Sequence, residues 1–301
     1  MLKERLNRAL ISVLELDKCE VQASLAGIDL EPVCITSSNR PRFGDFSSSL
    51  PLKLAGSDGA KALAIAQDLA LRMRALKESN DLIEELSVVA PGYLNFHLHT
   101  TCLAQVLGQI HREKRSYGQS SPGQRALFLE NHQLAAAIGF DPGMIGPTSR
   151  RDPVEFMRYV YARCMSLLRL AQEEYPNTHE GRIDPPPFDK AEWQKLQKLF
   201  ATECSIFEPA FVSQGERVVL ARTLVLRLDS MSSELEHWEN ANDSLRLGRY
   251  AYEVATGVEE FRQTVRFQTE ERALLAAALG VLSAGCQVLS NLGERIGVAL
   301  P

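Results

Sequence analysis

The residues best suited to chemistry in this sequence are arginines and tyrosines that alternate within one short segment, Arg158, Tyr159, Tyr161 and Arg163. Arginine binds phosphate through a fork of N–H donors, and a tyrosine ring can stack on a nucleobase. On a helix, Tyr159 and Arg163 would share one stripe, and Arg158 and Tyr161 would share a neighbouring stripe. Together, such an arginine and tyrosine could bind a phosphate and stack on a base. The alternative is that Tyr159 packs in a helical core while the arginines are solvated or salt-bridged.

A second group of cations beside an aromatic ring lies near the N-terminus. Arg40 and Arg42 could bind phosphate, and Phe43 follows them directly. The next two residues, Gly44-Asp45, are typical of a plain turn.

Metal chemistry is the weakest possibility. His97 and His99 lie two positions apart, so on a strand both could bind the same metal ion. The commoner explanation is that they are strand residues that face solvent or a neighbouring helix. We therefore expect neither a metal site nor a cofactor.

Bulk composition limits the class of protein. A length of 301 residues favours two domains, and 45% hydrophobic with 24% charged residues is typical of a soluble globular protein. There is no run of 18 uncharged apolar residues that would predict a membrane span. The six cysteines are scattered without a Cys-x-x-Cys pair, which predicts a reducing, cytoplasmic location. The net charge of −5 weighs against a general RNA-binding domain, although the basic residues are mostly arginine.

Three stretches with different patterns follow one another. Residues 1–118 predict a small α+β domain, with apolar residues at helical spacing near the start, a helix over 60–75, and a hairpin formed by 86–89 and 93–98. Residues 119–150 contain scattered Gly and Pro and predict a linker. Residues 151–301 predict an all-helical bundle, with helices over 152–174 and near 190–204, 215–240, 244–264 and 269–291. The expected fold class is therefore α+β followed by all-α.

Sequence motifs at both ends resemble the arginyl-tRNA synthetase family. The front carries Pro41-Arg-Phe-Gly-Asp-Phe46 and Ala90-Pro-Gly-Tyr-Leu-Asn-Phe96. The back carries the segment from Asp152 to Arg169, and Leu245-Arg-Leu-Gly-Arg-Tyr-Ala-Tyr-Glu-Val-Ala255, which is similar to the pattern of the helical anticodon-binding domain named for Asp-Ala-Leu-Arg (DALR). The resemblance implies that the N-terminal domain contacts the tRNA elbow and that Arg158, Tyr159, Tyr161 and Arg163 lie beside the anticodon loop.

The catalytic domain that lies between such segments in the family has no counterpart of sufficient length. The gap from Gln119 to Arg150 is 32 residues, whereas a nucleotide-binding domain needs roughly 100 or more. No two histidines have the His-x-Gly-His spacing of class I synthetases, and no Lys-Met-Ser-Lys-Ser loop follows. Without such groups the phosphate charge of a transition state is left unstabilised. We expect the chain not to be an enzyme.

Two functions remain open. The first is a non-catalytic paralogue that binds tRNA, with tRNA-Arg as one candidate, and assists a tRNA-modifying enzyme or the synthetase. The second is a protein-interaction module that no longer binds RNA. Tyr159, Arg163 and the arginine-rich composition favour the first. Three features favour the second: the net negative charge, Ser49 in place of the family's Asn, and an altered C-terminus.

Overall fold

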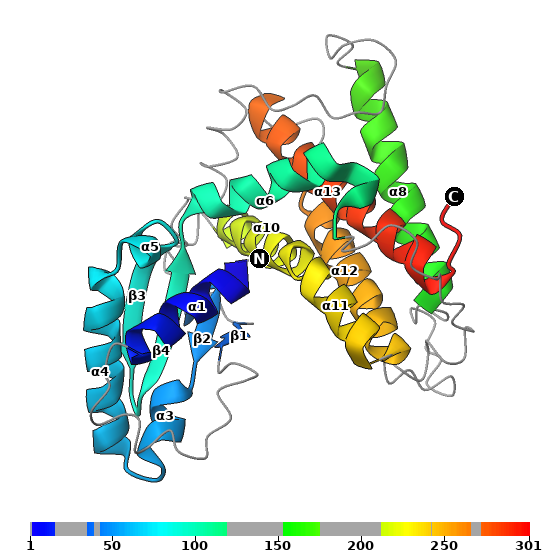
Figure 1. The fold of residues 1–301 in the computed structure, drawn as a ribbon. Helices are drawn as coiled ribbons and strands as arrows, with labels where there is room; N and C mark the ends of the chain where they lie inside the picture. Colours follow the sequence, from blue (N-terminus) through cyan, green and yellow to red (C-terminus); the bar gives the residue numbers. More distant parts are fainter. Residues whose placement is uncertain are drawn as a thin grey trace. The chain divides into compact units, whose positions relative to one another are not determined.

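The chain divides into two compact units, Met1–Leu103 and Ala104–Pro301 (Figure 1). The computed structural model describes residues 2–15, 35–38, 43–118, 153–174, 212–241, 243–265 and 272–301. The expected linker at 119–150, the helix expected near 190–204, and the cysteines Cys19, Cys34 and Cys204 lie outside these residues. The expected class, a small α+β unit followed by a helical unit, is confirmed.

The first unit is built around a four-stranded antiparallel sheet of order β1-β2-β4-β3. The helices α1 and α3 pack with α4, and α4 packs on β3 and β4. The elements are α1 Leu2–Glu15, β1 Ile35–Ser37, β2 Phe46–Ser48, α3 Leu50–Ala55, α4 Gly59–Ala75, α5 Lys77–Asn80, β3 Ile83–Val89 and β4 Tyr93–Leu98.

Helical and strand periodicity account for the core of this unit. On α1 the residues Leu2, Leu6 and Leu10 recur every four positions and are all buried, as the helical pattern predicted. On β4 the alternate residues Leu94 and Phe96 are completely buried. The intervening Asn95 is also buried, whereas Tyr93 on the same face is 41% exposed, so the second face of the strand is only partly covered.

Gly44 and Asp45 join β2 to β4 rather than forming a plain exposed turn. Gly44 has φ +77°, and a Cβ atom placed there would lie 2.5 Å from the carbonyl oxygen of Phe96. Only glycine allows both this conformation and this approach. The buried Asp45 carboxylate accepts a 2.7 Å hydrogen bond from the Leu98 N–H, and the Asp45 N–H donates to the Phe96 carbonyl. The Gly44-Asp45 motif therefore holds β2 and β4 together.

Among the residues that the structure describes, the second unit is mostly helical. α6 Thr100–Glu113 begins in the first unit and continues into the second, where η2 Lys114–Ser116 follows it. The others are α8 Pro153–Glu174, α10 Val212–Asp229, α11 Met231–Ala241, α12 Ser244–Gln263 and α13 Arg272–Ile296.

Buried polar contacts attach α6 and η2 to these helices. The His111 ring Nε2 lies 3.1 Å from the Gly280 carbonyl oxygen on α13. The Tyr117 hydroxyl donates to the Leu228 carbonyl of α10 over 3.2 Å, and the Asn291 side chain donates to the carbonyl oxygens of Lys114 and Tyr117. The division of the chain thus falls at Leu103/Ala104, whereas the sequence placed the end of the first domain at residue 118.

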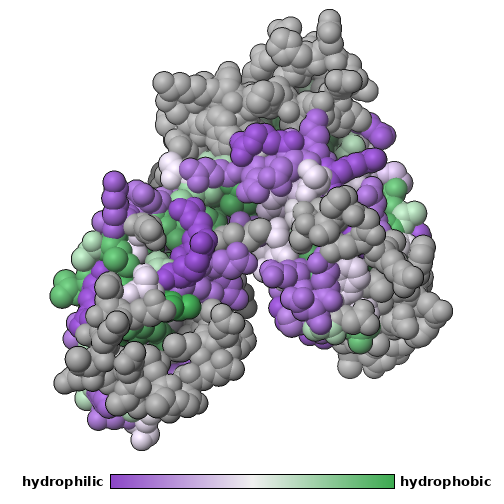
Figure 2. All heavy atoms as spheres, viewed as in Figure 1, coloured by the Kyte–Doolittle hydropathy of each residue, from purple (hydrophilic) through white to green (hydrophobic). Residues whose placement is uncertain are grey.

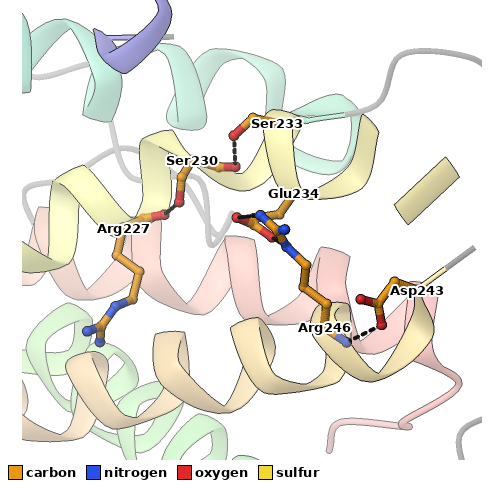
Figure 3. A network of polar contacts seen from close by, with 6 residues as sticks. All are labelled: Arg227, Ser230, Ser233, Glu234, Asp243 and Arg246. Carbon is orange, nitrogen blue, oxygen red and sulfur yellow. Dashed lines mark hydrogen bonds and ion pairs between the residues drawn. The ribbon is translucent and has the colours of Figure 1, made fainter. Parts of the chain in front are cut away.

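The single helix expected over 215–240 is wrong, because the chain turns at Ser230 between α10 and α11. The Arg227 carbonyl oxygen accepts from the Ser230 hydroxyl at 2.8 Å (Figure 3). The same oxygen also accepts from the Tyr250 hydroxyl at 2.6 Å. Local serine bonds of this kind compete with helical ones. Beyond the turn, the guanidinium group of Arg246 on α12 donates two hydrogen bonds to the carboxylate of Glu234 on α11.

α13 lies at the centre of the second unit and packs against α8, α10 and α12. Gly285 allows close approach, since a Cβ atom there would lie 2.6 Å from Cγ2 of Val258 on α12. By length and composition the span Leu274–Ile296 could cross a membrane, but 67% of its apolar window is buried inside the protein. Core helices pass the same test, so the span is weak evidence for a membrane.

Candidate nucleic-acid interface

α8 presents the Arg/Tyr segment, and its two sides differ sharply. One side packs on α12 and α13, with a tilted ring contact of 5.2 Å between Phe156 and Tyr252 of α12. Its buried residues are Val154, Phe156, Met157, Val160, Cys164 and Ala171. The opposite side carries exposed residues at spacings of three and four, so the helix has a continuous outer face.

Tyr159 lies on that outer face with 48% of its surface exposed. A tyrosine is usually more buried than this, because its ring carries a large apolar area. The alternative in which Tyr159 packs in the core is therefore wrong. An exposed ring on a rigid helix has the geometry that base stacking requires.

Arg163, one turn further along α8, is exposed beside Tyr159. Within the described parts of the chain no hydrogen bond or ion pair holds its guanidinium group. Leu170, two turns beyond, is 44% exposed on the same face. The outer face thus combines an aromatic ring, a cation and an apolar side chain.

Arg158 is held by other parts of the protein. Its Nε donates to the Ala299 carbonyl oxygen at 3.0 Å, and its NH1 group lies 2.9 Å from a Glu155 carboxylate oxygen. This arginine therefore fastens the C-terminal segment to α8. Its charge is already partly balanced, so it is the less suited of the two arginines to bind phosphate.

Tyr161 projects to the side of α8 that meets α13 and is half-buried. Burial raises the pKa of its phenol, and a hydrogen bond with Ser290 of α13 and the charges of Arg169 and Arg115 oppose that rise. The Tyr161 ring is thus mainly an interhelical contact, with cations close to its hydroxyl.

A charged cluster on α12 borders the Tyr159 side of α8. The buried Glu259 carboxylate holds Arg262 through two bonds of 2.8 Å. Hydrogen bonding to Glu259 raises the pKa of Arg262, and Tyr159 adds a smaller contribution of the same sign. The sequence interpretation missed Arg262. The Glu259–Arg262 spacing of three was visible, but its closeness to Tyr159 depends on how α12 packs on α8.

The candidates in the first unit are only partly placed. Phe43 is half-buried just before the Gly44-Asp45 junction, and Arg40 and Arg42 lie outside the described residues. His99 Nε2 lies 3.1 Å from the Asn80 carbonyl oxygen. No group of three or more His, Cys, Asp or Glu side chains that could hold a metal ion occurs among the residues the structure describes.

Comparison with known proteins identifies the first unit. The family model of the arginyl tRNA synthetase N terminal domain matches residues 1–98. The chain is 32% identical over 96 residues to an arginine–tRNA ligase of Bradyrhizobium sp. strain BTAi1, covering 32% of this chain and 15% of that protein. It is 29% identical over 108 residues to the Dehalococcoides mccartyi ligase, covering 36% and 18%. The first unit is therefore similar to the N-terminal domain of arginyl-tRNA synthetases, as its motifs predicted.

These matches cover only a small part of each relative. In the Listeria monocytogenes ligase, 26% identity over 125 residues covers 42% of this chain and 20% of the relative. The chain thus spans about a fifth or less of the length of the ligases it matches. The resemblance of the second unit to an anticodon-binding bundle remains a prediction.

Proposed function

We propose that this protein binds tRNA through a synthetase-like elbow-binding domain and a helical anticodon-binding unit, without aminoacylating it. It would present tRNA to a modifying enzyme or to the synthetase. The observation that carries the proposal is the outer face of α8, where Tyr159 and Arg163 are both exposed one turn apart. A ring and a guanidinium group in that arrangement can stack on one nucleotide and bind the adjacent phosphate.

The relationship of the first unit to ligases that act on tRNA supports this choice of ligand. A local surface can bind RNA despite the net charge of −5, because screening in physiological salt limits each charge to about 8–10 Å. What matters is the charge near the contact and not the sum over the chain.

The test is a filter-binding titration of transcribed tRNA-Arg at several salt concentrations. Replacing both Tyr159 and Arg163 by alanine should weaken binding by about ten-fold or more, since a stacked base contributes roughly 1–3 kcal/mol. Arg163→Ala alone should flatten the line of log affinity against log salt by up to about one unit. The exposed Arg249 of α12 gives a matched control, Arg249→Ala, which should leave both quantities nearly unchanged.

The proposed lack of aminoacylation activity is tested separately. We expect no arginine-dependent pyrophosphate exchange and no ATP binding by calorimetry, because the sequence has no His-x-Gly-His and no Lys-rich loop. Micromolar ATP affinity would contradict the non-catalytic part of the proposal and leave the tRNA part standing.

A second function is favoured by one feature of the same face. Tyr159 and Leu170 are both large, apolar in part and exposed on α8, which is also how a helix anchors a protein partner. In that case the wild-type protein would not bind tRNA even at low salt, and the interaction-module hypothesis would replace the first.

A further inference from the structure

Two partly apolar side chains project from the outer face of α8. Tyr159 is 48% exposed and Leu170 is 44% exposed. Each residue turns an α-helix by about 100°, so Leu170 lies only about 20° from Tyr159 around the helix axis. The rise of about 1.5 Å per residue places the two roughly 16 Å apart along that axis. They therefore point in nearly the same direction from two separate positions on one helix.

A polar row, which consists of Arg163, Ser166 and Arg169, crosses the outer face between these two side chains. All three residues of the row are exposed. They follow one another at intervals of three positions, so Arg163 and Arg169 flank Ser166 by about 60° on opposite sides. Because the whole row belongs to α8, helical geometry alone sets this arrangement.

The middle of the polar row is small and carries no charge. The Ser166 hydroxyl donates a 2.9 Å hydrogen bond to the carbonyl oxygen of Ala162, one turn earlier in α8. It is therefore held against the helix backbone, and no long side chain separates the two arginines. Residues 159–170 include no aspartate or glutamate, and Glu155, before them, is bonded to Arg158. A phosphate group can thus approach Ser166 with a guanidinium group on each side.

We propose that the polar row, Tyr159 and Leu170 together bind unpaired RNA along the axis of α8. One base stacks on the Tyr159 ring and a second packs on Leu170. The sugar–phosphate backbone between them passes over Ser166 and contacts the two arginines of the row. This inference rests on the proposed function and extends it, because it adds Ser166, Arg169 and Leu170 to the contact surface and specifies RNA that is not base-paired.

The spacing of the two apolar side chains favours unpaired RNA over a duplex. In a duplex the face of each base is covered by its neighbours and cannot stack on a side chain. In loops and at strand ends, unstacked bases can be splayed onto separate side chains. Two contact positions roughly 16 Å apart on one helix require bases that are splayed in this way.

The composition of the face favours RNA over a protein partner. In the view of Figure 2, hydrophilic residues cover much of the described surface of the second unit. Protein interfaces are anchored by clustered residues that become fully buried, whereas the polar row separates Tyr159 from Leu170. Exposed arginines on both sides of a small uncharged residue are complementary in charge to a phosphate chain. Such contacts position a strand without reading its sequence.

The first experiment compares two RNA probes by fluorescence anisotropy with the full chain. One is a hairpin with the anticodon-arm sequence of tRNA-Arg, which has an unpaired loop, and the other is a blunt duplex of the same base composition. The hairpin should bind about ten-fold more tightly or better, since only its loop offers bases that can stack on side chains. Equal affinity for the two probes would overturn the inference.

A pair of substitutions at Ser166 tests the centre of the polar row. Ser166→Asp places a carboxylate between the two arginines, where it pairs with the guanidinium groups and repels phosphate. Hairpin affinity should fall about ten-fold or more. The melting temperature should stay level, because opposite charges three positions apart stabilise a helix. Ser166→Asn has nearly the same shape as the aspartate without its charge and should keep affinity within about three-fold of wild type. Equal losses in both variants would reject the phosphate contact.

Two further variants separate the cation from the apolar contact. Arg169→Gln should lower hairpin affinity and flatten the line of log affinity against log salt by up to about one unit, because one phosphate contact is lost. Leu170→Ala should lower affinity about three-fold or more without changing that slope, because an apolar contact releases no counterions. The matched controls lie on α12, where Arg249 is exposed and Leu245 is 45% exposed. Arg249→Gln and Leu245→Ala should leave affinity and slope nearly unchanged.

The outcomes separate this inference from the proposed function. The double variant with Tyr159→Ala and Arg163→Ala tests the function alone. If it loses tRNA affinity while the variants at Ser166, Arg169 and Leu170 keep theirs, the inference is rejected and the proposed function stands. If the wild-type chain binds neither the hairpin nor tRNA-Arg, both fail and the protein-partner alternative replaces them.

Discussion

The motif that identifies the first unit and the helix that carries the candidate site of the second unit use their residues in opposite ways. In the first unit Gly44 and Asp45 are buried and hold β2 against β4. In the second unit Tyr159 and Arg163 project from α8 into solvent. A family motif can therefore be a structural junction, while candidate contact residues lie where the side chains do not pack in the core. Substitutions at the two places should have opposite consequences for stability and for binding.

The largest effect is expected from Gly44→Val. A branched side chain would collide with the Phe96 carbonyl oxygen, which is 2.5 Å from the Cβ position, and would force a disfavoured φ. We expect a loss of roughly 3 kcal/mol or more in the stability of the first unit. Hydrogen exchange should show lost protection in β2 and β4 while α12 and α13 stay protected. Unchanged protection in β4 would contradict the structural role of the motif.

The next effect is an acid-dependent loss of stability in the second unit. Burial lowers the pKa of His111 to about 4 from 6.5, with Lys114 adding to the shift and the Gly280 carbonyl opposing it. The unfolded state therefore binds the proton more readily, and stability falls as pH drops from 6.5 towards 4. The contribution is roughly 3 kcal/mol.

Chemical unfolding at a series of pH values checks this expectation. His111→Gln keeps a donor for Gly280 but cannot take up the proton, so the fall between pH 6.5 and 4 should be shallower. His237→Gln, at an exposed position of α11, is the control and should keep the wild-type slope. Identical slopes in wild type and His111→Gln would remove His111 as the cause.

An intermediate effect is expected from Asp45→Ala. The change leaves the buried Leu98 N–H without its acceptor, which typically costs about 1–3 kcal/mol. Asp58→Ala removes an exposed N-cap bond to the Lys61 N–H and should cost about 1 kcal/mol. If thermal unfolding ranks Asp58→Ala as the more harmful change, the Asp45 bond is not important for the strand junction.

The smallest effect on stability is expected on α8. Tyr159→Ala and Arg163→Ala should each change the free energy of unfolding by about 0.5 kcal/mol or less, because both side chains are exposed. Arg158→Ala should cost more, since it releases the Ala299 carbonyl. A large drop in melting temperature for Tyr159→Ala would mean that its ring packs in the fold, and the contrast with Gly44 would disappear.

The elements with strong periodicity were predictable from sequence. Those in question are α4, α8, α12 and the β3–β4 hairpin, whose apolar residues recur at a constant spacing. The turn at Ser230 was not predictable, because it depends on the Tyr250 hydroxyl bonding to the Arg227 carbonyl from another helix. Long-range contacts of this kind leave no local signal.

The candidate site shows the same limit. The sequence placed Arg158 and Arg163 on α8 but could not show which of the two guanidinium groups would bond to another part of the protein. That depends on Ala299, 141 positions away. The attachment of η2 to α13 likewise depends on Asn291, which is 177 positions from the Lys114 carbonyl that it bonds.

The bond between Arg158 and Ala299 also has a practical side. Val298 donates to the Gly293 carbonyl at 2.9 Å, so the residues that lead to Pro301 are directed back along α13 towards α8. Any group attached to Pro301 begins two residues from the carbonyl that Arg158 holds. A purification tag there would crowd the helix whose ligand is being sought. A small environment-sensitive dye at the same position would instead report the arrival of a ligand by a change in its fluorescence.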